Sequence, residues 1–60
     1  MDARTLERLL FANGCQIMFE IYTEDDRMIR VVQTLDGQEW KLIYNRNEHY
    51  MFIISSAERI

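Results

Sequence analysis

The chain has few of the cysteine and histidine residues that form disulfides and metal sites in small domains. Cys15 is the single cysteine, so no internal disulfide can form, and this usage is typical of a reducing compartment. His49 is the single histidine, and it lies far from Cys15 outside any CxxC or HxxxH spacing. This pair cannot supply the ligand set of a structural zinc site. We therefore predict no disulfide, no metal and no cofactor.

Long apolar runs and clustered positive charge are also missing. No stretch approaches the roughly 18 consecutive apolar residues of a membrane span. The opening Met1-Asp2-Ala3-Arg4 lacks the basic and apolar parts of a signal peptide, so we expect no export and a cytoplasmic protein. The net charge of −3 argues against a general nucleic-acid binder, because phosphate contacts call for clustered basic residues.

The length of the chain limits how much surface it can bury. Its 60 residues make one domain, 1–60. A domain of this size hides only about 60% of the surface that the unfolded chain exposes. Small domains compensate with disulfides, a metal or oligomerisation. Since the first two are excluded, the composition favours self-association as a homodimer.

Apolar spacing and end signals predict a helix over residues 3–12. Asp2 is a suitable N-cap, and Asn13-Gly14 provides a left-handed stop. The apolar side chains fall within one arc of this helix, which predicts a single core-facing stripe. Those in the arc are Ala3, Leu6, Leu9 and Leu10, and those towards the other side are Arg4, Glu7, Arg8 and Phe11.

After Gly14 the apolar period changes to two, which predicts strands. We expect strands near 17–22, 28–35, after Asp36-Gly37, and 49–54, with 55–60 as a tail or short helical turn. The fold class is α+β, an N-terminal helix packed on one face of a three- or four-stranded antiparallel meander sheet.

Asp36-Gly37 is a signal for a two-residue type I′ hairpin turn. It would place Leu35 opposite Gln38 and so fix which side chains share a face. The predicted core face carries Ile29, Val31, Gln33, Trp40, Leu42 and Tyr44. The opposite face carries Met28, Arg30, Val32, Thr34, Glu39, Lys41 and Ile43.

The fourth strand shows no alternation, so its orientation stays open. An even loop would bury His49, Met51 and Ile53. A three-residue loop with Asn47 left-handed would bury Tyr50, Phe52 and Ile54. Either arrangement leaves an apolar set on the far side of the sheet.

One short helix covers one face of a sheet, so we expect an uncovered apolar face that binds protein. We predict a non-catalytic, homodimeric regulator, adaptor or inhibitor whose partner is a second copy, a larger protein, or both. The predicted interaction residues on the sheet are Met18, Tyr22, Met28, Arg30, Val32, Lys41, Ile43, Tyr50, Phe52 and Ile54. Those on the helix are Arg4, Arg8 and Phe11. The alternative is a single-stranded nucleic-acid-binding sheet that uses Arg30, Lys41 and aromatic residues.

A third interpretation is a small RNA endonuclease using His49. The run Leu6-Glu7-Arg8-Leu9-Leu10, followed by Asn13-Gly14-Cys15 and strands, resembles the start of small toxin-type RNA endonucleases of the double-stranded-RNA-binding fold. In that family a glycine-rich turn after the first strand carries the catalytic histidine. This chain has Glu24-Asp25-Asp26-Arg27 there, so the resemblance implies no catalysis and assigns no family.

Overall fold

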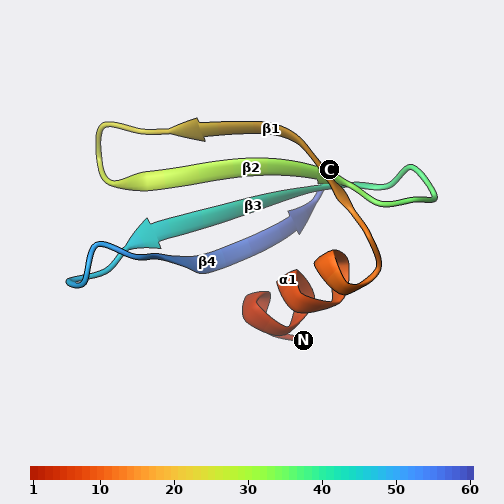
Figure 1. Cartoon of the computed structure of the whole chain (residues 1–60), viewed down its shortest axis with the longest axis horizontal. Coiled ribbons are helices and arrows are strands. Elements are labelled where there is room, and N and C mark those ends of the chain that lie inside the picture. Colours follow the sequence, from red (N-terminus) through yellow and green to blue (C-terminus); the bar gives the residue numbers. More distant parts are fainter.

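A computed structural model describes residues 1–60 as one helix followed by four strands. The elements are α1 (Ala3–Ala12), β1 (Gln16–Tyr22), β2 (Arg27–Gln33), β3 (Glu39–Arg46) and β4 (Phe52–Arg59). The strands form an antiparallel sheet in the order β1-β2-β3-β4 (Figure 1). The predicted α+β meander is confirmed. The bounds of the last strand were wrong, because β4 begins at Phe52 and includes most of the segment expected to be a tail.

The predicted caps define α1. The Asp2 carboxylate accepts the Thr5 amide at 2.8 Å, and the Asn13 side chain donates to the Leu9 carbonyl at 2.7 Å. Gly14 follows with φ +79°, a conformation that glycine adopts without steric cost. Figure 1 shows α1 beside β4, with which it makes contacts, at one edge of the sheet. No helix in the chain has the length and apolar character needed to cross a bilayer.

The three hairpins share one loop design. Each loop has three residues between the last paired positions and ends on a residue with positive φ. The residue before each loop has a side-chain oxygen that accepts a hydrogen bond from the backbone amide of the residue after the loop, at 3.0 to 3.1 Å. The accepting residues are Thr23, Thr34 and Asn47, and the left-handed residues are Asp26, Gly37 and Tyr50.

This design corrects the predicted register of β2 and β3. The loop between them is Leu35-Asp36-Gly37, not a two-residue turn, and Trp40 pairs with Val32 instead of Gln33. A slip of one residue turns every side chain of one strand to the other face. The predicted core positions of Ile29, Val31 and Gln33 were therefore wrong. Those of Trp40, Leu42 and Tyr44 on β3 were right.

The core lies on the face of the sheet that α1 covers. Its buried members are Leu10, Met28, Val32, Leu42 and Tyr44. Val32 and Leu42 have no exposed surface. Leu6, Cys15, Trp40, Phe52, Ile54 and Ala57 pack against this cluster. Burial raises the pKa of the Cys15 thiol, which disfavours the reactive thiolate form.

The orientation of β4 follows from its loop. Phe52 and Ile54 face the core, as the three-residue alternative required. The left-handed residue is Tyr50 and not Asn47, so Tyr50 lies in the loop and is exposed instead of buried. Ile53 points to the other face and is exposed.

The sheet is curved. The rings of Tyr22 on β1 and Phe52 on β4 lie 5.6 Å apart, although these strands are at opposite edges of the sheet. We call the face that carries the core the concave face and the opposite one the convex face. The concave face is closed by α1 and by the Tyr22 and Phe52 rings. Nothing in the chain covers the convex face.

Candidate interaction surface

β1 is exposed along its whole length. All seven of its residues are exposed, and five of them are large and apolar. Their exposed fractions are 47% for Ile17, 53% for Met18, 51% for Phe19, 40% for Ile21 and 63% for Tyr22. We call these five the β1 surface. It stays open because α1 packs at the other edge of the sheet.

The apolar area of β1 continues across the convex face. The register places Ile21 opposite Ile29, and Ile29 opposite Ile43; in the next row Phe19 is opposite Val31. We call Phe19, Ile21, Ile29, Val31 and Ile43 the convex cluster. Towards β4 the same face becomes polar, with Lys41 opposite Glu58 and Ile43 opposite Ser56. The uncovered apolar area is therefore centred on β1 and β2.

The polar groups of β1 and β2 are paired on the concave face. The Arg30 Nε lies 2.6 Å from the Glu20 carboxylate, and the guanidinium lies 5.1 Å from the centre of the Tyr44 ring. The Tyr44 hydroxyl donates to Glu7 of α1 and accepts from Arg30 at 3.4 Å. Burial and the hydrogen bond to Glu7 raise the pKa of Tyr44 to about 12. This network ties α1 to β1 and uses the only charge on β1.

The structure separates the predicted interaction residues of the sheet into three groups. Lys41 and Ile43 lie on the convex face, as predicted. Met18, Tyr22 and Tyr50 are exposed, but Tyr22 points to the concave side and Tyr50 lies in a loop. Met28, Val32, Phe52 and Ile54 belong to the core or pack against it, and Arg30 is on the concave face.

Three of the misplaced residues have one cause. The one-residue slip exchanged the two faces of β2, so Met28, Arg30 and Val32 were assigned to the wrong side. Their neighbours Ile29 and Val31 occupy the convex face instead. The missed signal is the repeated pattern Thr-x-Asp, at Thr23 to Asp25 and again at Thr34 to Asp36.

The three interaction residues predicted on α1 lie at the protein surface. Arg4, Arg8 and Phe11 are all exposed, with Phe11 at 38%. They lie on the side of the helix that does not pack on the sheet. This surface is separate from the convex cluster.

The pairing that the nucleic-acid alternative needs is absent. Arg30 and Lys41 were expected on the same face, but Lys41 pairs with Val31 and therefore faces away from Arg30. Arg30 is also engaged by Glu20. The basic sheet surface proposed for stacking single-stranded bases does not form.

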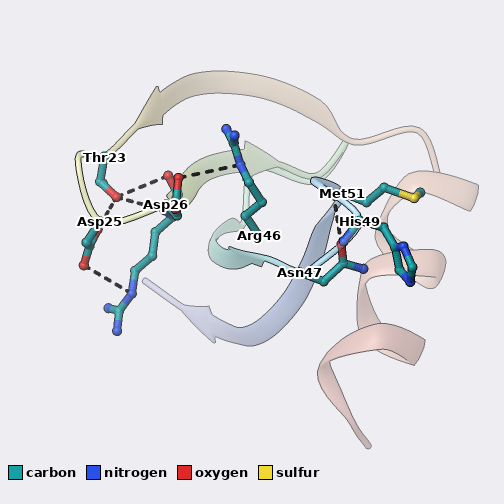
Figure 2. Close-up of polar contacts among 8 residues, drawn as sticks. Thr23, Asp25, Asp26, Arg46, Asn47, His49 and Met51 are labelled. Carbon is teal, nitrogen blue, oxygen red and sulfur yellow. Dashed lines mark hydrogen bonds and ion pairs between the residues drawn. The ribbon is translucent and has the colours of Figure 1, made fainter.

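The loops beyond β1 and β3 gather polar residues at one end of the sheet (Figure 2). Asp25 accepts from the Thr23 hydroxyl, which lowers its pKa, and Asp26 lies 3.7 Å from Arg46. The His49 side chain points away from these aspartates (Figure 2) and lies 3.6 Å from its neighbour Glu48. The chain has no group of three or more acidic, Cys or His side chains placed to hold a metal.

A groove of about 400 Å³ lies between the end of α1 and the hairpin that joins β2 to β3. Leu9, Leu35 and Trp40 supply apolar walls, and Asp36 is its one acidic group. The Thr34 hydroxyl lowers the pKa of Asp36, which favours the ionised form of this carboxyl group. No pattern in the sequence predicted this groove.

No protein-family model, curated protein or solved structure matches this chain.

Proposed function

We propose that this protein is a non-catalytic interaction module that self-associates through the β1 surface. The observation that carries this proposal is the exposure of all seven β1 residues, five of them large and apolar. Contiguous apolar patches of several hundred Å² on small proteins mark sites of protein contact.

The apolar side chains of β1 that are exposed support the proposal. Full burial of a large apolar side chain contributes roughly 1.5 to 3 kcal/mol. The β1 side chains are about half exposed, so their burial on association would contribute several kcal/mol per copy, against a typical domain stability of about 5 to 15 kcal/mol.

The proposed role is that of a regulator, adaptor or inhibitor of a larger protein. A dimer formed through β1 would leave both copies of the outer side of α1 free. This side carries Arg4, Arg8 and Phe11, a combination of aromatic and arginine side chains that is enriched at protein interfaces. The dimer would thus present two equivalent sites to a hetero-partner.

Sedimentation equilibrium from low micromolar to millimolar concentration tests the self-association. We expect the unmodified chain to approach the dimer mass, and Phe19→Ser to weaken the dimer at least about tenfold, a loss of roughly 1.4 kcal/mol. Phe11→Ser is the matched control, because Phe11 is also exposed but lies on α1. A monomer at every concentration, or a larger effect of Phe11→Ser, would contradict the proposal.

A further inference from the structure

The outer edge of β1 offers unpaired backbone groups at known positions. The Thr23 amide donates to the Arg27 carbonyl at 2.8 Å, so the polar groups of Thr23 face β2. In an antiparallel pair the backbone groups of successive residues point alternately towards and away from the partner strand. Ile21 therefore also faces β2. Glu20 and Tyr22 turn their amides and carbonyls outwards, where this chain provides no partner strand.

The two edges of the sheet differ in how they are protected. Edge strands avoid unwanted pairing through charge, proline, bulges or a covering element. β4 has Glu58 and Arg59 near its end, an irregularity in its pairing with β3, and α1 beside it. β1 has no lysine or proline, and its one charge, Glu20, is bound to Arg30. Its bulge lies between Ile17 and Phe19, which leaves the stretch from Phe19 to Tyr22 regular.

We propose that a second copy of this chain adds to β1 edge to edge, with the two β1 strands antiparallel about a two-fold axis at Ile21. This inference rests on the proposed self-association and specifies its geometry. The axis places Glu20 of each copy opposite Tyr22 of the other, so the outward amides and carbonyls of both residues pair across the interface. The two four-stranded sheets become one continuous sheet.

The side chains at this junction are self-complementary. Within one copy the Tyr22 hydroxyl donates to Glu20 at 3.3 Å, and the axis brings a second such donor opposite each Glu20. Arg30 compensates the charge of Glu20 in each copy, so the two acidic side chains approach without net repulsion. On the convex side Ile21 meets its counterpart, which makes the two convex clusters contiguous.

The exposed area of β1 is in the range of a small specific interface. With roughly 200 Å² for a fully exposed large side chain, the β1 surface holds at most about 500 Å² per copy. Two copies together offer up to about 1,000 Å², which is the lower bound for a specific interface and is typical of a weak dimer.

Residue-resolved hydrogen exchange by NMR tests this geometry on the unmodified protein. At concentrations where sedimentation shows the dimer, we expect the Glu20 and Tyr22 amides to exchange at least about tenfold more slowly than in the dilute monomer. The Ile21 amide, which is bonded to β2 in both states, serves as the internal reference. A dimer in which both amides still exchange as in the monomer would overturn the edge-to-edge inference and leave the proposed self-association intact.

A pair of variants gives a second, independent readout. Tyr22→Pro removes one outward amide, and Tyr22→Ala keeps it, while both lose the contact of the Tyr22 ring with Phe52. We expect the dissociation constant of Tyr22→Pro to exceed that of Tyr22→Ala at least about tenfold. Equal dimerisation of two folded variants would overturn the inference. A monomeric unmodified chain would overturn both the inference and the proposed function.

Discussion

The two edge strands have similar lengths, yet only β4 is partly covered. On β4 the side chains of Phe52, Ile54 and Ala57 pack against the core beside α1. On β1 every residue is exposed, including Phe19 and Ile21. The difference follows from the position of the single helix beside β4 and from the composition of the strands, because β4 carries serines and charged residues where β1 is mostly apolar. One edge is therefore stabilised by contacts within the chain, whereas the other is exposed to solvent.

The largest expected loss of stability comes from truncating a buried side chain of β3, and we compare it with truncation of an exposed side chain of β1. Leu42→Ala deletes a side chain with no exposed surface and is expected to cost about 2 to 5 kcal/mol, enough to unfold much of the protein. Ile21→Ala, at 40% exposure, is expected to cost less than about 1 kcal/mol in the dilute monomer. Urea unfolding followed by circular dichroism measures both. Equal costs would show that β1 is as well packed as β3.

An intermediate loss of stability is expected when the hydrogen-bond network that links α1 to β1 through Tyr44 is broken. Tyr44→Phe removes the hydroxyl that contacts Glu7 and Arg30, and hydrogen bonds to charged groups contribute about 1.5 to 3 kcal/mol. Urea unfolding at neutral pH measures this loss, with Tyr50→Phe, which removes an exposed hydroxyl, as the control. A cost no greater than that of the control would contradict a structural role for the network.

The Tyr44 hydroxyl should also make the free energy of unfolding depend on pH. The folded protein holds the pKa of Tyr44 near 12, above its ordinary value of 10.0, so the folded state keeps its proton longer than the unfolded state. This contribution to the free energy of unfolding is complete below about pH 10 and is lost as the pH rises towards about 12. Unfolding midpoints across this range should fall more steeply for the unmodified chain than for Tyr44→Phe. Parallel slopes would contradict the assignment.

The smallest expected effect concerns the loop that leads into β4. Tyr50 has φ 60°, a conformation that is strained for a bulky side chain, whereas Gly37 occupies the same loop position without strain. Relief of such strain contributes of order 1 kcal/mol, so Tyr50→Gly should stabilise the domain and Gly37→Ala should destabilise it. Thermal unfolding checks both signs. A destabilising Tyr50→Gly would mean that the ring makes contacts that outweigh the strain.

The order of elements could be predicted because its signals are local. Asp2 and Asn13-Gly14 define the ends of α1, and the change of apolar period after Gly14 defines β1. The register could not be predicted in the same way. Asp36-Gly37 fits both a two-residue turn and the last two positions of a three-residue loop, and the two choices differ by one residue. The side chain of Thr34, which accepts the Gln38 amide, favours the longer loop.

The candidate surface was predictable as a type of surface but not residue by residue. A ten-residue helix cannot cover both faces of this sheet, and that conclusion is independent of register. Which residues lie uncovered does depend on register, so Ile29 and Val31 were missed while Ile43 was placed correctly. The orientation of β4 depended on Tyr50 adopting a left-handed conformation, which bulky residues rarely do.

We propose that a second copy of the chain stabilises the exposed strand β1. The most direct test is the urea unfolding midpoint of the unmodified chain at protein concentrations from low micromolar to millimolar. Dimerisation predicts a midpoint that rises with concentration, with a gain of up to about 1.4 kcal/mol in the free energy of unfolding for each tenfold increase. A midpoint that stays constant over the whole range would contradict the claim.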